Sequence, residues 1–193
     1  MRSSCVRFVA ILAAVALLRS GVGAISVMAP TFQELVAEAQ TVFVGEVTAT
    51  QTLWTGTGAE RTIVTNVTFA VESTLKGAGA SVRVLRFLGG TVDDQTLSVP
   101  GIPTFKVGDR AVLFVTSDVN AISPLVGVMH GRFPLTKASD GHEYVALHDG
   151  RVFSSVDQVG PSAVTASRTP LRPMRREDFE NEIRLELQRR GGR

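Results

Sequence analysis

The segment RTIVTNVTFAVESTLKG, residues 61–77, has the most regular alternation of apolar and polar side chains in this chain of 193 residues. When extended, one face presents Ile63, Thr65, Val67, Phe69 and Val71, and the other presents Val64, Asn66, Thr68, Ala70 and Glu72. A period of two is typical of a β-strand with one buried face. The segment therefore predicts the long central strand of a small β domain.

Further strands are predicted on both sides of this segment. Residues 41–54, TVFVGEVTATQTLW, place Phe43, Val47 and Ala49 on one side, and the link TGTGAE turns them into a hairpin with residues 61–77. Gly45 inside this strand indicates a bulge, a strong bend or a close backbone approach. Shorter strands are predicted within residues 81–88, 91–99, 111–115, 121–136 and 140–147. The third of these is apolar enough for burial on both faces.

Two helices flank the predicted strands. Thr31 and Glu34 form a capping-box pattern at the start of a short helix, TFQELVAEAQ. Near the other end, Phe179, Ile183 and Leu187 recur every four residues and predict an amphipathic helix. We expect this helix to cap the domain; a second hypothesis is that it docks on a partner protein.

Together these elements predict a mainly β fold. The predicted architecture is a five- to seven-stranded antiparallel OB-like barrel with a short N-terminal helix and a C-terminal amphipathic helix. The barrel domain is assigned to residues 25–153 and the C-terminal helix to residues 174–190. Residues 154–173, rich in Ser, Thr, Pro, Val and Gly without a sustained period, are interpreted as a linker.

Residues 1–24 have the pattern of a cleaved export signal. Arg2 and Arg7 precede an apolar run of 11 residues, 8–18, and small residues follow. This run is too short to span a bilayer of about 30 Å as a helix. The expected location is therefore secreted or periplasmic, with no membrane attachment after cleavage. Cys5, the single cysteine, lies in this signal, so the mature chain is predicted to contain no disulfide and no catalytic or metal-binding thiolate.

The charge balance disfavours nucleic acid as a partner. The signal carries three of the 20 basic residues and no acidic residue, which leaves 17 basic against 18 acidic residues in the mature chain. A nucleic-acid-binding domain is expected to have a clustered basic face with stacking aromatic side chains. The sequence shows no such pattern.

No pattern typical of a catalytic or metal centre is present in the sequence. His130, His142 and His148 are separated by 12 and 6 residues, which does not match a helical pair of zinc ligands, and no HExxH occurs. No serine stands in a GxSxG motif. We therefore expect no catalytic residue, no metal and no cofactor, and we interpret the histidines as unrelated surface residues.

The candidate binding residues are in predicted loops. Trp54 lies at the mouth of the first hairpin loop, where an aromatic side chain can bind a ligand or pack on the hairpin. Asp93 and Asp94 are adjacent and would point to opposite faces of a strand, so we expect them in a solvated turn. These three residues are the predicted binding candidates, and no metal is assigned to the two aspartates.

The order of several short motifs resembles an uncharacterised family of bacterial secreted proteins. The motifs are A-x-x-V-F-x-G-x-V at residues 39–47, F-x-V-x-x-x-L-K-G at 69–77 and G-x-P-x-F-x-x-G-D/E-R-x-V-L-F at 101–114, with GRF at 131–133. The resemblance covers residues 31–136. It implies an OB-like barrel in which the shared positions serve turns and the core, namely Gly45, Gly77, Phe105, Gly108 and Phe133.

The same arrangement is distantly similar to the netrin-like domain of tissue inhibitors of metalloproteinases, a five-stranded OB-type barrel. In those inhibitors a cysteine at the mature N-terminus chelates the zinc of the protease. Here Ile25 is expected to begin the mature chain, and no cysteine follows it. Inhibition by that chemistry is therefore not implied for this chain.

The leading functional hypothesis is an exported, non-enzymatic binding module that holds a protein or saccharide partner through the loops of its barrel. One alternative is a regulator or inhibitor of a secreted protease. A second alternative, from a different class, is a metal-dependent or hydrolytic enzyme that uses the histidines together with nearby acidic residues.

Overall fold

A computed structural model describes residues 28–116, 122–161 and 172–192. The predicted export signal and residues 162–171 of the predicted linker lie outside these described residues. The strands in the described ranges are β1 (Thr41–Thr55), β2 (Thr62–Lys76), β3 (Val82–Leu88), β4 (Gly90–Val92), β5 (Gln95–Leu97), β6 (Arg110–Val115), β7 (Arg132–Lys137) and β8 (Glu143–Val145). In the same ranges, the α-helices are α2 (Phe32–Glu38) and α3 (Arg176–Gly191), and the 3₁₀ helices are η1 (Gly58–Glu60) and η2 (Val156–Gln158).

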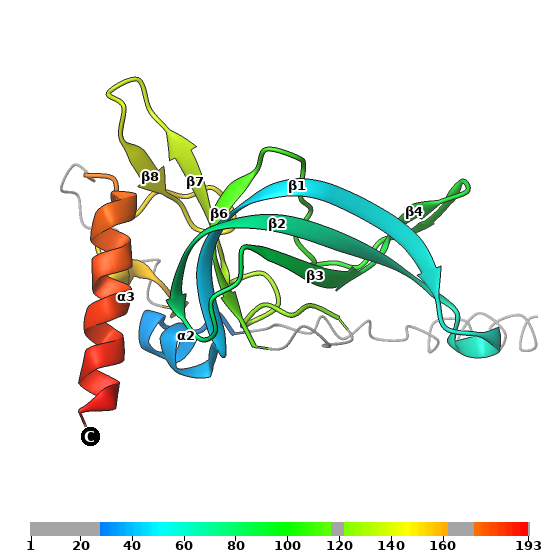
Figure 1. Cartoon of the computed structure of the whole chain (residues 1–193), viewed down its shortest axis with the longest axis horizontal. Helices are drawn as coiled ribbons and strands as arrows, with labels where there is room; N and C mark the ends of the chain where they lie inside the picture. Colours follow the sequence, from blue (N-terminus) through cyan, green and yellow to red (C-terminus); the bar gives the residue numbers. More distant parts are fainter. Residues whose placement is uncertain (1–27, 117–121, 162–171, 193) are drawn as a thin grey trace, which may run out of the picture.

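Six strands form one antiparallel sheet in the order β3-β2-β1-β6-β7-β8, and β4 and β5 form a separate two-stranded arm. The predicted hairpin is present as β1 and β2, two strands of 15 residues each that curve together (Figure 1). The prediction of a mainly β, antiparallel fold with two α-helices is thus confirmed. β3 and β8 are the sheet edges and do not pair with each other in the described residues, so the predicted barrel is not closed.

An irregularity at Gly45 confirms the bulge predicted there. Val44 pairs with Ser73 whereas Gly45 pairs with Val71, so Glu72 is the extra residue on β2. A bulged residue is not held in the regular pairing, and its side chain is re-aimed. Glu72 lies on the face of the sheet on which the charged cluster described below is formed.

The last of three register shifts between β1 and β2 follows Val47 and inverts the alternation of β1. Val47 pairs with Phe69 whereas Ala49 pairs with Thr68, and adjacent residues of β2 point to opposite faces. Ala49 therefore lies on the face opposite Val47, and the sequence prediction that grouped the two was wrong. The extra residue is the physical reason, because a slip of one position moves every later side chain to the other face.

The first hydrophobic core lies between the sheet and the two α-helices. The predicted capping box at the start of α2 is confirmed, since the Thr31 hydroxyl accepts the Glu34 N–H and the Glu34 carboxylate accepts the Thr31 N–H. The largest buried members of this core are aromatic, namely Phe32, Phe114, Phe133, Phe153 and Phe179.

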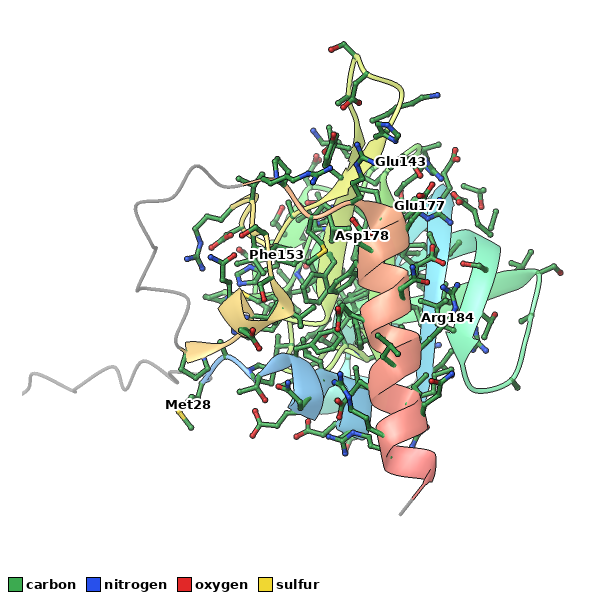
Figure 2. The ribbon with its side chains drawn as sticks, turned by 90° about the vertical axis from the view of Figure 1, so that its left-hand side faces the viewer. Met28, Glu143, Phe153, Glu177, Asp178 and Arg184 are labelled. Carbon is green, nitrogen blue, oxygen red and sulfur yellow. The ribbon has the colours of Figure 1, made fainter. Side chains whose placement is uncertain are left out.

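The apolar stripe of α3 is buried in this core. Phe179 and Ile183 are fully buried, and α3 lies along one side of the sheet (Figure 2). The prediction that this helix caps the domain is confirmed, and its stripe is occupied by the core of its own chain. In the described residues, no helix has both the length and the apolar character needed to cross a membrane.

Part of the predicted linker packs on the same core. η2 begins after Ser155, whose hydroxyl accepts the Asp157 N–H, and Val159 just beyond η2 is buried. Residues 154–161 therefore cover the core, while residues 162–171 lie outside the described part of the chain.

A second hydrophobic core lies on the other face of the sheet. Phe43, Phe69, Phe87 and Leu113 project into it from four strands, and Phe105 packs against it from the segment before β6. Residues 111–115 contribute alternately to the two cores and are all buried, as predicted. The far end of this second face, beyond the last buried residues of β1, is hollowed.

Candidate functional site

A groove of about 350 Å³ occupies that end of the sheet. Its floor is the face of β1, β2 and β3 that carries the second hydrophobic core, which we call the inner face. The β4–β5 arm forms one wall of the groove, and residues 98–105 form the other. The lining consists of Thr50, Thr52, Thr65, Val67, Phe87, Leu88, Gly89, Gly90, Thr91, Thr96, Leu97, Ser98, Val99, Ile102, Pro103, Thr104 and Phe105. None of these side chains is charged, and many carry a hydroxyl group.

The register shift after Val47 directs the β1 threonines into this groove. Beyond the shift, Thr50 pairs with Val67 and Thr52 pairs with Thr65, so these side chains return to the inner face. The hydroxyl oxygens of Thr52 and Thr65 are 3.2 Å apart, and the Thr65 hydroxyl donates to the Gly89 carbonyl at 2.7 Å. The floor is thus hydrogen-bonded to the start of the arm.

Gly90 lets the arm lie directly on the floor of the groove. Its φ is +130°, and a Cβ at this position would lie 2.5 Å from atoms of both Thr52 and Thr65. Contacts below 3.0 Å require the surrounding atoms to move, and this backbone conformation is rarely adopted by residues with a Cβ. A glycine is therefore required where the arm leaves the sheet.

The opposite wall is fixed by aromatic and charged contacts. The rings of Phe87 and Phe105 have centroids 5.0 Å apart, and the Arg132 guanidinium lies 4.5 Å from the centroid of Phe105. Arg132 also donates to the Thr104 carbonyl at 2.8 Å. These contacts hold an apolar ring surface beside the hydroxyl groups of the floor.

Trp54 lies next to the groove but is not part of its lining. It pairs with Ile63, two positions beyond the Thr52 and Thr65 pair, and therefore shares the inner face of the hairpin. The Arg61 guanidinium lies 4.2 Å from the centroid of the Trp54 ring and occupies its surface with a cation–π contact.

Asp93 and Asp94 form the tip of the β4–β5 arm. Both are exposed, and their φ angles of +48° and +64° give the left-handed conformation that two-residue hairpin turns require. The prediction of a solvated turn is confirmed. None of the three candidate residues is in the groove lining, and the residues that line the groove were not predicted.

The structure brings two of the three histidines together, although their spacing in the sequence indicated no relation between them. His130 and His148 meet with their ring centroids 4.6 Å apart, whereas His142 lies elsewhere, beside Arg110 and Glu143. The interpretation of all three as unrelated surface residues was therefore wrong for this pair, because residues 130–148 fold back on themselves through β7 and β8. In the described residues, no group of three or more His, Cys, Asp or Glu side chains could hold a metal ion.

We expect the histidine pair to make stability fall on mild acidification. Burial lowers the pKa of both His130 and His148; Asp149 opposes this, and Arg132 and Arg151 add to it at His148. The unfolded chain therefore binds more protons as the pH falls below about 6.5, and stability present above this pH is lost as the pH falls through the folded pKa. Urea unfolding at pH 7.5 and 5.5, followed by Trp54 fluorescence, measures the loss.

Replacement of the pair should reduce this dependence. H130Q and H148Q should each flatten the change in unfolding free energy between the two pH values, while H142Q, outside the pair, serves as the matched control. Equal pH dependence in the parent protein, H130Q and H148Q would refute the assignment.

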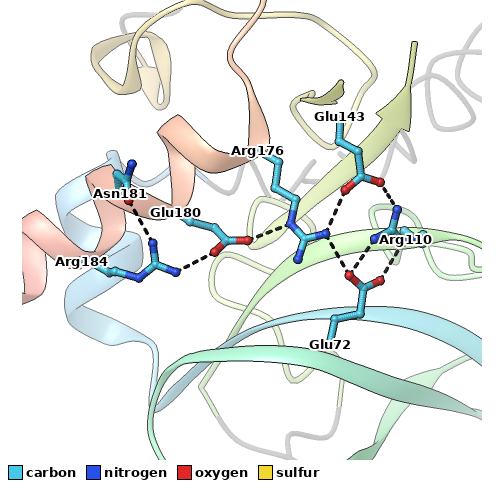
Figure 3. A network of polar contacts seen from close by, with 7 residues as sticks. All are labelled: Glu72, Arg110, Glu143, Arg176, Glu180, Asn181 and Arg184. Carbon is cyan, nitrogen blue, oxygen red and sulfur yellow. Dashed lines mark hydrogen bonds and ion pairs between the residues drawn. The ribbon is translucent and has the colours of Figure 1, made fainter. Parts of the chain in front are cut away.

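A cluster of charged side chains joins α3 to the sheet (Figure 3). Glu72 of β2 accepts from Arg110 at 2.6 Å and from Arg176 at 2.9 Å, and Glu143 of β8 accepts from the same two arginines. Arg176 continues to Glu180 at 2.8 Å. We call these five residues the charged cluster.

The charged cluster is better suited to fixing the helix than to chemistry. The guanidinium of Arg110 holds the pKa of Glu72 below its usual value, so the carboxylate is charged at neutral pH. A hollow of about 520 Å³ beside the cluster is lined by Arg110, Lys137, Gly141, His142, Glu143, Arg175, Arg176, Glu177 and Glu180. Four of these side chains are already engaged in ion pairs, namely Arg110, Glu143, Arg176 and Glu180. The neutral groove is therefore the stronger candidate site.

No family model matches the chain, and neither a curated protein nor a solved structure matches it. The resemblance of residues 31–136 to secreted and netrin-like proteins therefore stays a prediction. The chemistry of the groove and of the surfaces around it is the basis for the function proposed below.

Proposed function

We propose that this chain is an exported, non-enzymatic binding module that holds a neutral saccharide in the threonine-lined groove. The observation that carries the proposal is the lining itself, which combines hydroxyl groups with phenylalanine rings and contains no charged side chain. The volume of about 350 Å³ lies in the range of small-molecule sites. Export to a secreted or periplasmic location rests on the signal pattern of residues 1–24.

The chemistry of a sugar matches both parts of this lining. Sugar hydroxyls donate and accept hydrogen bonds, as do the side chains of Thr50, Thr96 and Ser98. The C–H face of a sugar ring is apolar and can pack on Phe87 or Phe105. A phosphate or carboxylate group would find no cationic side chain in the lining to compensate for its lost hydration.

The absence of titratable side chains from the lining favours binding over turnover. Hydrolysis of a glycosidic bond ordinarily uses two carboxyl groups on either side of it, and the groove lining contains none. His130 and His148 border a different, smaller hollow. The resemblance of residues 31–136 to OB-like barrels supports this proposal, because proteins of that fold bind oligosaccharides on the strand face between their loops.

An array of neutral and anionic oligosaccharides tests the proposal, followed by calorimetry on each neutral sugar that is retained. We expect T50V to weaken binding about tenfold, or ~1.4 kcal/mol, because it removes a groove hydroxyl but keeps the shape of the side chain. T68V is the matched control, since Thr68 lies on the opposite face of β2. Retention of anionic sugars alone, or equal losses in T50V and T68V, would contradict the proposed site.

A further inference from the structure

Among the described residues, β3 is an edge strand of the sheet. It is the outer strand of the sheet, next to β2 (Figure 1), and its seven residues pair with β2 without a register shift. The Gly89 N–H donates to the Ile63 carbonyl, and the Ser81 carbonyl accepts the Val71 N–H. Because antiparallel pairs alternate, the odd-numbered residues of β3 bond inward to β2.

The backbone groups of Val82, Val84 and Arg86 consequently point away from the sheet. No backbone hydrogen bond is made along this outer edge at these three residues within the described ranges, although the Leu88 N–H beyond them donates to Ile122. The side chains of Val82 and Val84 are 56% and 50% exposed. Exposed edges of this kind are templates for an added strand.

The opposite edge of the sheet is protected. β8 has three residues, Tyr144 forms a β-bridge with Arg175, and the Val145 N–H donates to the Met174 carbonyl. The segment before α3 therefore covers β8. The contrast leaves β3 as the edge at which a partner strand can be added.

The charge of β3 indicates what its partner carries. Arg83 and Arg86 stand on the strand, which has no acidic residue. Among the described residues the Arg86 guanidinium donates to Asn66 at 3.4 Å and forms no ion pair. A carboxylate on an added strand would complete its charge pairing.

We propose that the β3 edge binds an extended acidic peptide segment of another protein as an antiparallel strand. Apolar residues of the peptide lie beside Val82 and Val84, and an acidic residue lies beside Arg86. A second copy of this chain fits less well, because another β3 has no carboxylate to pair with Arg86. The proposal is independent of the saccharide groove.

Two fluorescein-labelled heptapeptides, TETVTVT and TKTVTVT, provide the probe for the full chain, because their charged residue and two valines share one face and can lie beside Arg86, Val84 and Val82. Fluorescence anisotropy should show at least tenfold tighter binding of the glutamate peptide. R86E should reverse the preference, whereas R151E, a charge reversal on an exposed arginine outside the sheet, should leave it unchanged. Trp54 fluorescence verifies that each variant is folded.

Hydrogen–deuterium exchange locates the bound peptide. The glutamate peptide should slow exchange at the amides of Val82, Val84 and Arg86, which point outward in the free protein. Equal affinity for the two peptides, an unchanged preference in R86E, or protection confined to another element would overturn the proposal. So would a β3-mediated dimer in analytical ultracentrifugation that V84K converts to a monomer, because the occupant would then be a second copy.

Discussion

Replacement of Phe179 by alanine is expected to lower the free energy of unfolding by about 3–5 kcal/mol. The side chain is fully buried, and its ring has centroid distances of 4.9 Å to Phe133, 5.8 Å to Phe153 and 5.7 Å to Phe32. These partners come from β7, the segment after β8 and α2. The substitution therefore leaves a cavity at the point where α3 meets three separate parts of the chain.

Urea unfolding followed by Trp54 fluorescence measures the effect, because Trp54 is the single tryptophan and lies near the end of β1, outside the core that holds Phe179. L185A is the matched control on the same helix, where Leu185 is 44% exposed, and should cost less than about 1 kcal/mol. A loss below ~1 kcal/mol in F179A would mean that α3 does not depend on this core for its position.

The packing of α3 was predictable in outline from the sequence. Phe179 and Ile183 stand four residues apart on a polar helix, and such a stripe has to be buried somewhere. The capping box of α2 and the β1–β2 hairpin were equally visible, because each depends on residues close together in the chain. Local pattern was sufficient for these elements.

The groove was not predictable because one register shift in β1, after Val47, decides which side chains face it. Simple alternation placed Ala49 with Phe43 and Val47, and its continuation would put Thr50 and Thr52 on the other face. The register shift after Val47 reverses this assignment. A bulge inside a polar stretch carries no clear sequence signal, although Gly45 did mark the shift between Val44 and Gly45.

Contacts between distant segments escaped prediction as well. His130 and His148 were treated by their separation along the chain, but the β7–β8 hairpin brings their rings together. The charged cluster joins residues 72, 110, 143, 176 and 180, which come from three strands and one helix. In that cluster, opposite charges could be recognised as partners only after the strand order was known.

Replacement of Arg110 by methionine is expected to lower the free energy of unfolding by about 2–3 kcal/mol at pH 7. Arg110 bonds to Glu72 through Nε at 2.7 Å and Nη2 at 2.6 Å, and its Nη1 donates to Glu143. Its side chain is 27% exposed, so solvent weakens these ion pairs but does not remove them. Methionine keeps an apolar stem of similar length, and the loss therefore reports the missing charge rather than a cavity.

The loss in R110M should shrink on acidification, and this distinguishes charge from packing. In the parent protein Arg110 lowers the pKa of Glu72, so the stability from this pair is present above the unfolded value near 4.5 and is lost as the pH falls through the folded pKa. Urea unfolding at pH 7 and pH 3 should show the R110M difference falling by at least half. R151M removes an exposed ion pair with Asp149 and should cost less than about 0.5 kcal/mol at pH 7. A pH-independent loss in R110M would show that the arginine acts through its stem, because only the ion pairs depend on ionised carboxylates.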